Sequence, residues 1–291
     1  MNLAKLAANL CKVSEEQPLD LKRELHWPDK IDLKQWSMSP ELISLYGTET
    51  FEQLSEEQQM KLSFFEAVNF FSLNIHGERH LMSGMAKLLY SPEMKDYTPY
   101  LHHFLAEENN HSTYFGMFCY RYADKVYPDM NSDGLPREYK KGEQEFLYFA
   151  KVMLFEECFD RYNVKMASDN RLPEIVRDIN RCHHIDESRH LAFGRQLIKE
   201  LFERYSPQWG DATLENVRAH IVAYMDSFWR DLFNFRAYKD AGIPNPIEVR
   251  DAALESAQGT RHYQELTKAV SAYFIKTGIL NSEPSTSKAA G

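Results

Sequence analysis

The sequence predicts an all-α protein built on a four-helix bundle with additional helices. Apolar residues recur at helical spacing along most of the 291 residues, and no stretch alternates apolar and polar residues as a half-buried strand would. Only 12 Gly and 12 Pro interrupt the chain, and they separate four long helical stretches. One core bundle accounts for all four stretches.

The four core helices are predicted from their apolar stripes, whose residues recur every three or four positions. The first stripe contains Val68, Phe71, Ile75, Met82, Met85 and Leu89, and the second contains Leu101, Phe104, Leu105, Phe115 and Phe118. The third helix is predicted over residues 138–167. The fourth begins near Pro173, because proline is tolerated in the first turn of a helix, and its stripe contains Ile175, Ile179, Leu191, Leu197 and Leu201.

The remaining segments are predicted from turn residues and composition. A loop is expected at residues 131–136, a fifth helix over residues 206–241, and one or two shorter helices from there to residue 278. Residues 1–36 contain Pro18 and Trp27-Pro28, and we expect an extended N-terminal arm on the bundle. The bundle domain then covers residues 37–278, and residues 279–291 are expected to be a disordered tail.

The charge balance and the cysteines exclude several classes of protein. With 34 Lys and Arg against 43 Asp and Glu, the chain carries a formal charge of −9 and no basic block, so we expect no nucleic-acid partner. No apolar run reaches the length of a membrane span, and the charges in the first 15 residues argue against a secretory signal. The cysteines lack a CxxC pair, which argues against a cysteine-based zinc site and favours a reduced, cytoplasmic protein; they are Cys11, Cys119, Cys158 and Cys182.

Each core stripe is interrupted by residues that do not belong in an apolar face. They are Glu78 in the first helix, Glu108 and His111 in the second, Glu156 in the third, and His183, Glu187 and His190 in the fourth. Burying a carboxylate costs several kcal/mol or more unless it is paired or bound to a metal. Four carboxylates and three imidazoles at equivalent depth therefore indicate a shared cation.

The spacing of these residues indicates which cation. Glu108 and His111 form one ExxH pair, Glu187 and His190 form another, and residues at i and i+3 share a helix face. A glutamate precedes the first pair by 30 residues and the second by 31, which is the distance up one helix and back on an antiparallel partner. This repeated unit is typical of di-iron carboxylate bundles, in which two helices each supply a glutamate and the other two each supply an ExxH pair. Oxygen-rich ligand sets with a few imidazoles favour iron or manganese over zinc or copper.

Neighbouring acidic and histidine residues compete for these roles. Glu157 is a rival to Glu156, since both lie within about one helical step of the apolar centre. Glu66 lies too far before Glu108 for a return at the same height. Glu107 and Asp186 are expected to accept an imidazole N–H from the other helix pair and so fix its tautomer. The other nearby histidines are expected to be solvated or structural, namely His76, His80, His102, His103 and His184.

At these motifs the chain resembles the p-aminobenzoate N-oxygenase family of di-iron oxygenases, which are ferritin-like. The resemblance rests on Gly77-Glu78, Glu107-Glu108-Asn-Asn-His111, Glu156-Glu157-Cys158-Phe159 and His183-His184-Ile-Asp-Glu187-Ser-Arg-His190, with a weaker echo at Gly259-Thr260-Arg261. It covers roughly residues 60–275 and favours Glu156 over Glu157. The ligands that it implies are Glu78, Glu108, His111, Glu156, His183, Glu187 and His190. The part after Gly259 matches poorly, and Gln264 stands near the family's arginine for the substrate carboxylate.

The resemblance implies an O2-dependent monooxygenase with two iron ions as cofactor and O2 as co-substrate. It would oxidise an amine to a hydroxylamine, nitroso or nitro product through a peroxo-diferric intermediate. The amine would be a small molecule, free or tethered to a carrier protein, and the resembled family implies a homodimer. Because no flavin or NAD fingerprint is visible, we expect an external electron donor.

Other di-iron functions compete with this reading. A C-hydroxylase, a desaturase or an oxidative-cleavage enzyme is the main alternative, because fold and metal site do not fix the substrate. A ferritin-like ferroxidase is less consistent with the sequence, since such chains are normally shorter. A radical-generating ribonucleotide reductase subunit would carry a tyrosine four residues after the first ExxH histidine, where this chain has Phe115.

Overall fold

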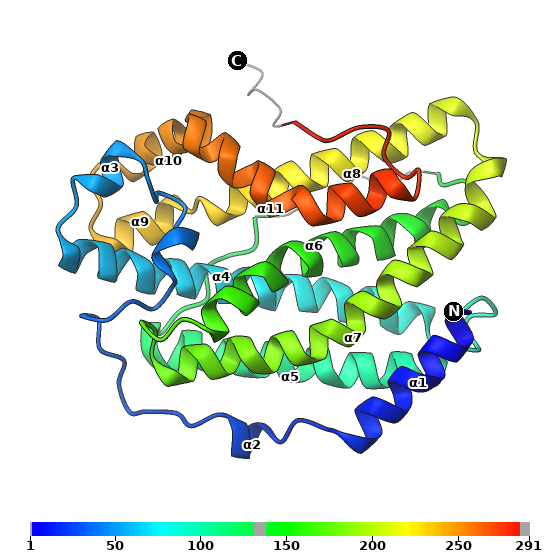
Figure 1. Ribbon diagram of the computed structural model, residues 1–291, viewed down its shortest axis with the longest axis horizontal. Helices are drawn as coiled ribbons and strands as arrows, with labels where there is room; N and C mark the ends of the chain where they lie inside the picture. Colours follow the sequence, from blue (N-terminus) through cyan, green and yellow to red (C-terminus); the bar gives the residue numbers. More distant parts are fainter. Residues whose placement is uncertain (1, 131–137, 286–291) are drawn as a thin grey trace.

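The computed structural model describes residues 2–130 and 138–285, and all regular elements within these ranges are helices (Figure 1). The predicted all-α fold is therefore confirmed. Four long helices form the core, as expected: α4 (Glu56–Leu88), α5 (Thr98–Ala123), α6 (Glu143–Ala167) and α7 (Glu174–Tyr205).

Local sequence signals set the ends of the core helices. Ser55 and Gln58 form a reciprocal capping box at the start of α4, and Ser55 lies thirteen residues before Val68, the first predicted stripe residue. Gly142 precedes α6 with a φ of 74°, a backbone conformation that glycine adopts without strain. Pro173 precedes the first turn of α7, where its missing N–H is not needed.

The core helices pack as two antiparallel pairs, α4 with α5 and α6 with α7, and the pairs meet between α4 and α6 and between α5 and α7. Gly77 and Gly84 on α4 allow this close approach. A Cβ atom at Gly77 would lie 2.5 Å from the ring of Phe155, and one at Gly84 would lie 2.1 Å from the ring of Tyr148. Gly77 directly precedes Glu78, so this contact fixes the height of the first cluster residue relative to α6.

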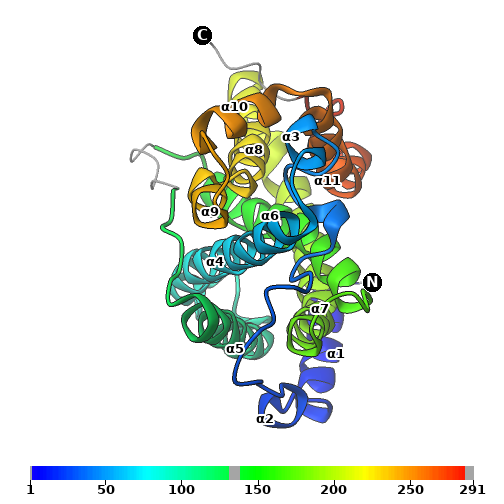
Figure 2. The same cartoon turned by 90° about the vertical axis from the view of Figure 1, so that its left-hand side faces the viewer.

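Four further helices cover one side of the core, and α1 and α2 lie on the opposite side (Figure 2). The four are α8 (Asp211–Leu232), α9 (Phe235–Ala241), α10 (Pro246–Glu255) and α11 (Ala257–Lys276). The prediction of a single helix over residues 206–241 is wrong. This segment contains a short 3₁₀ turn, η2 (Ser206–Gln208), and the two helices α8 and α9, which are separated by a break. Asn234 makes this break by accepting the backbone N–H of Arg236 as an N-cap.

The N-terminal segment corrects the expectation of an extended arm. Residues 3–16 form the amphipathic helix α1 (Leu3–Glu16), which packs against α5 and α7 with Leu3 and Ala7 buried. Short turns follow in α2 (Leu21–Glu24), η1 (Pro40–Leu42) and α3 (Glu49–Glu52). The hydrophobic face of α1 explains the difference, since helices in proteins are stabilised chiefly by packing such a face.

The C-terminal segment packs against the bundle for two residues beyond the predicted end of the domain, although α11 ends at Lys276. Ile279 and Leu280 are buried, and Arg218 donates from Nε to the carbonyl oxygen of Ile279 over 3.1 Å. The predicted disordered tail is therefore wrong at these two residues. Residues 286–291 and the loop predicted at residues 131–136 lie outside the described residues.

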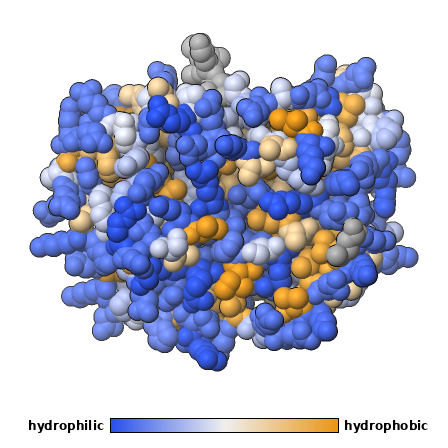
Figure 3. All heavy atoms as spheres, viewed as in Figure 1, coloured by the Kyte–Doolittle hydropathy of each residue, from blue (hydrophilic) through white to orange (hydrophobic). Residues whose placement is uncertain are grey.

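The visible surface is mostly hydrophilic, with small scattered apolar patches (Figure 3). Among the described helices, none has a stretch both long and apolar enough to cross a membrane.

Candidate metal centre

The seven side chains selected from the sequence meet in the middle of the four-helix core. Each is at most 2% exposed, and they come from all four core helices: Glu78 from α4, Glu108 and His111 from α5, Glu156 from α6, and His183, Glu187 and His190 from α7. Their donor atoms form overlapping groups within 4.8 Å of one another, each of a size that could hold a metal ion. We call these seven residues the carboxylate–histidine cluster.

Two of the imidazoles turn the same ring nitrogen toward the cluster. His111 Nδ1 lies 3.0 Å from Glu108 Oε2 and 3.4 Å from Glu187 Oε1. His190 Nδ1 lies 3.0 Å from Glu108 Oε1 and 3.1 Å from Glu187 Oε1. The ExxH spacing places each histidine one turn after its glutamate, and both pairs face the same centre.

The third imidazole uses its other nitrogen. His183 Nε2 lies 3.4 Å from Glu78 Oε1 and 3.3 Å from Glu187 Oε1. His183 and Glu187 are four residues apart on α7, so they share its inner face with His190.

Many polar atoms of the cluster have no hydrogen-bond partner within the described chain. Both carboxylate oxygens of Glu78 and of Glu156 are buried without a partner, and so is His183 Nε2. Burial and the neighbouring carboxylates raise the pKa values of Glu78 and Glu156 well above the usual range. These orphaned atoms fit a site for cations, because four carboxylates balance the charge of two divalent ions.

The outer nitrogens of two imidazoles contact carboxylates. His111 Nε2 lies 3.1 Å from Asp186 Oδ2, and His190 Nε2 lies 2.7 Å from Glu107 Oε2. Arg189 donates to both Glu107 and Asp186, which places one guanidinium between the two acids. Each pair joins α5 to α7, and the arrangement leaves both Nδ1 lone pairs free to face the cluster.

A residue that the sequence analysis did not select contacts the third imidazole. Asn163 on α6 is fully buried, and its amide nitrogen lies 2.7 Å from His183 Nδ1. It follows Glu156 by seven residues, two helical turns along the same face. The spacing of two helical turns from a predicted ligand could have identified Asn163 in the sequence.

The structure separates Glu156 from its neighbours in the list of candidates. Glu157 turns away from the cluster and forms an ion pair with Arg195, with a contact of 2.9 Å from Nε. Glu66 is buried elsewhere and accepts from the backbone N–H of Ser44 over 2.8 Å. Neither carboxylate belongs to the metal-compatible groups of the described residues.

The five other histidines considered in the sequence contact groups outside the cluster. These groups are the carbonyl of Tyr127 for His76, Asp129 for His80, Tyr90 for His102, Glu15 for His103 and Asp160 for His184. Cys11, Glu15 and His103 form a separate, partly exposed group at the contact between α1 and α5. Its carboxylate, Glu15, is exposed, so this group lacks the buried charge of the cluster.

Apolar and aromatic side chains surround the cluster. The ring of Phe104 stacks on His190 at 3.7 Å between centroids, and Phe115 meets His183 edge-on at 4.9 Å. A cavity of about 10 Å³ lies beside Glu156 and His190. It is lined otherwise by apolar residues, so it offers room for about one water-sized molecule next to Glu156.

Comparison with known proteins agrees with this geometry. No curated protein matches the chain. A family described as P-aminobenzoate N-oxygenase AurF matches residues 2–278, which include all of the core helices and the cluster. The fold is accordingly ferritin-like, and the chain belongs to the p-aminobenzoate N-oxygenase AurF family.

Proposed function

We propose that this protein is a non-haem di-iron monooxygenase that uses O2 to oxidise the nitrogen of a small-molecule amine to a hydroxylamine, nitroso or nitro group. The carboxylate–histidine cluster would hold the two iron ions through four glutamates and three histidines. The observation that carries the proposal is the set of buried carboxylate oxygens without partners at the centre of a chain of this family. Uncompensated, four such carboxylates would be costly to bury.

Two iron ions, when bound, would supply the electrons that reduce and activate O2. The chain itself contributes position, charge and exclusion of water. Glu107 and Asp186 accept N–H groups of His190 and His111, and so hold each Nδ1 lone pair toward the metal. Arg189 offsets the charge of both acids, which limits the negative charge outside the ligand set.

The apolar walls have a separate role. Phe104 and Phe115 lie against the imidazoles, so bulk water is kept from the ligands. The small cavity beside Glu156 would admit a molecule about as small as water or O2 to the ligands. A dry site strengthens the electrostatic interactions within it and protects reactive intermediates from side reactions.

We also propose that the amine is free or carrier-tethered, that an external donor supplies the reducing equivalents, and that the protein works in the cytoplasm as a homodimer. Family membership supports a small-molecule substrate. The amine itself is to be found by screening.

Metal analysis with two matched variants tests the proposal. Protein produced with iron is expected to hold two iron ions per chain and to convert candidate amines to N-oxidised products under O2. Glu156→Gln is expected to lose at least one iron and the activity, because the amide cannot supply the missing negative charge. Glu157→Gln, the neighbouring position paired with Arg195, is expected to keep both ions.

The outcomes separate the competing functions. Products hydroxylated or desaturated at carbon would show that the protein carries out the alternative di-iron chemistry and is not an N-oxygenase. Loading far beyond two iron ions per chain would indicate a ferroxidase or store. Equal iron contents in the Glu156→Gln and Glu157→Gln variants would contradict the proposed metal site itself.

A further inference from the structure

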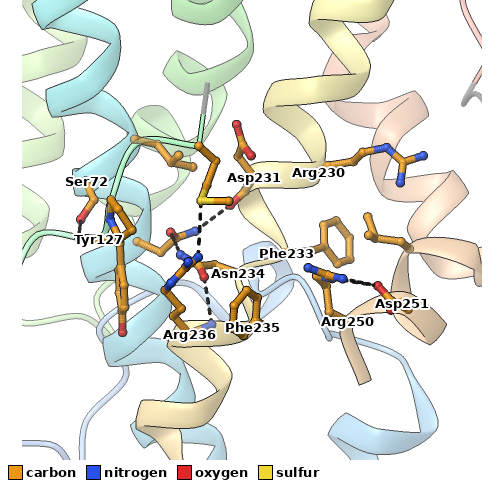
Figure 4. A pocket seen from close by; sticks show the side chains of 15 residues that line it. Ser72, Tyr127, Arg230, Asp231, Phe233, Asn234, Phe235, Arg236, Arg250 and Asp251 are labelled. Atoms are coloured by element: carbon orange, nitrogen blue, oxygen red, sulfur yellow. Dashed lines mark hydrogen bonds and ion pairs between the residues drawn. The ribbon is translucent and has the colours of Figure 1, made fainter. Parts of the chain in front are cut away.

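A second cavity lies where α4, α8, α9 and α10 meet (Figure 4). Its volume is about 290 Å³, and its lining includes none of the seven cluster residues. The part used below combines aromatic, cationic and aliphatic side chains, namely Phe233, Phe235, Arg236, Arg250 and Leu254, and the lining also contains the acidic residues Asp231 and Asp251. Neither the family assignment nor the proposed oxygenation uses this cavity.

Two side-chain amides, those of Asn69 and Asn234, fix one wall of the cavity. Asn69 is 2% exposed, donates to the carbonyl oxygen of Asp231 over 3.1 Å and accepts from Asn234 Nδ2 over 2.7 Å. Asn234 in turn caps α9 by accepting the backbone N–H of Arg236 over 2.9 Å. The break between α8 and α9 is thus fixed, and it sets the position from which Arg236 extends.

Two guanidinium groups lie on either side of one aromatic ring, as Figure 4 shows. The Cζ atom of Arg236 lies 4.6 Å from the ring centroid of Phe235, and that of Arg250 lies 5.5 Å from it. Stacking on an aromatic face orders a guanidinium and leaves its N–H edge available for a planar acceptor.

The two arginines differ in whether a carboxylate neutralises their charge. Arg250 is paired with its neighbour Asp251, with 2.6 Å between Nη2 and Oδ1. The Nη1 atom of Arg236 contacts the thioether sulfur of Met130 at 3.4 Å, and thioethers are weak acceptors. Within residues 2–130 and 138–285, no carboxylate lies within ion-pair distance of Arg236. Among the described residues, the guanidinium of Arg236 therefore has no ion-pair partner, in a chain whose formal charge is −9.

We propose that this cavity binds a small organic carboxylate. The guanidinium of Arg236 would hold the carboxylate in a two-pronged hydrogen bond, with Arg250 as the second cation, and the apolar body would lie against Phe233 and Leu254. One unpaired guanidinium balances the single charge of a carboxylate, whereas a phosphate dianion would need a second free cation. The site does not depend on the metal centre.

Binding of benzoate to the purified, iron-loaded protein, measured by calorimetry, tests the proposal. One benzoate is expected to bind per chain, and its neutral analogue benzamide is expected to bind at least about tenfold more weakly, because charge-assisted bonds to arginine are lost. Arg236→Gln is expected to weaken benzoate binding by about tenfold or more. Lys239→Gln removes the same charge from an exposed position on α9 and is expected to leave binding unchanged.

Four results would overturn the assignment. The first two are an absence of benzoate binding and an affinity for benzamide equal to that for benzoate. The third is unchanged benzoate binding in Arg236→Gln, which is expected if the carboxylate binds at the metal centre instead. The fourth is tighter binding of inorganic phosphate than of benzoate, with the same dependence on Arg236. If Arg236→Gln fails to fold by circular dichroism, Arg236→Lys takes its place. That variant keeps the charge and loses the planar fork, so a several-fold loss of affinity is expected and an unchanged affinity contradicts the proposal.

Discussion

The outer nitrogens of the three cluster imidazoles have unequal partners. Those of His111 and His190 face carboxylates, whereas Nδ1 of His183 lies 2.7 Å from the neutral amide of Asn163. An imidazole that donates to a carboxylate is the more basic metal ligand. We therefore expect His183 to be the most weakly held imidazole of the three, and Asn163 to decide whether its Nε2 lone pair faces the metal.

Removing the Asn163 amide tests this expectation. Asn163→Ala is expected to weaken iron binding by roughly 10- to 100-fold, because His183 loses the group that orients it. Asn163→Asp puts an acceptor oxygen where the amide nitrogen now contacts His183 Nδ1, and it is expected to restore most of the affinity by holding the imidazole proton on Nδ1. Asn74→Ala removes another fully buried amide, one that donates to the carbonyl of Phe70, and serves as the control. Iron competition with a chelator measures the affinity, and equal losses for Asn163→Ala and Asn74→Ala would rule out the orienting role.

At the scale of single residues, the sequence was sufficient to find charged groups in apolar stripes, because a buried carboxylate stands out against its neighbours. Asn163 escaped that search, since an uncharged amide in a helix is ordinary. Periodicity alone also left Glu156 and Glu157 undecided. Their separation depends on Arg195, which reaches Glu157 from α7 and lies 38 residues away in the sequence.

At the scale of helices, the sequence predicted the core helices, but it did not predict how the covering helices begin and end. The stripes predicted α4 to α7 because each helix buries one long face. The break between α8 and α9 depends on Asn69 of α4, which binds the carbonyl oxygen of Asp231, a contact across 162 residues. Likewise, the burial of Ile279 and Leu280 depends on packing that no local pattern encodes.

The contact between α4 and α6 makes a prediction of its own. Gly77→Ala would place a Cβ atom 2.5 Å from the ring of Phe155, which itself packs on Phe159 at 4.1 Å between centroids. The variant is expected to lower the free energy of unfolding by about 1–3 kcal/mol, the usual effect of overpacking. Gly116→Ala on α5 meets nothing within 4 Å and is expected to raise that free energy by up to about 1 kcal/mol through helix propensity. Urea unfolding of both variants measures the difference, and a stabilised Gly77→Ala would contradict the close contact.

At the scale of the whole molecule, a polar network joins segments that are distant in the sequence. Ser44, between η1 and α3, hydrogen-bonds to Glu66 of α4 over 2.5 Å and to the hydroxyl of Tyr238 of α9 over 2.6 Å. The N-terminal segment is tied again where Ser39 donates to Asp169, beyond the end of α6. The chain before α4 therefore links the core to the covering helices, which the sequence did not indicate.

Glu66 makes this network sensitive to pH. Burial raises the pKa of its carboxyl to about 8, against an ordinary value of 4.5. Between these two values the unfolded chain has released the proton that the folded chain retains, so the stability contributed by Glu66 falls as pH rises. The loss is at most about 5 kcal/mol across that window. Glu66→Gln is expected to flatten the pH dependence of the free energy of unfolding from pH 5 to 8 and to be relatively more stable at pH 8. Glu57→Gln, at an exposed position of α4, is expected to keep the wild-type slope in urea unfolding across the same range. A slope in Glu66→Gln as steep as that of the wild type would show that the proton on Glu66 does not hold these segments together.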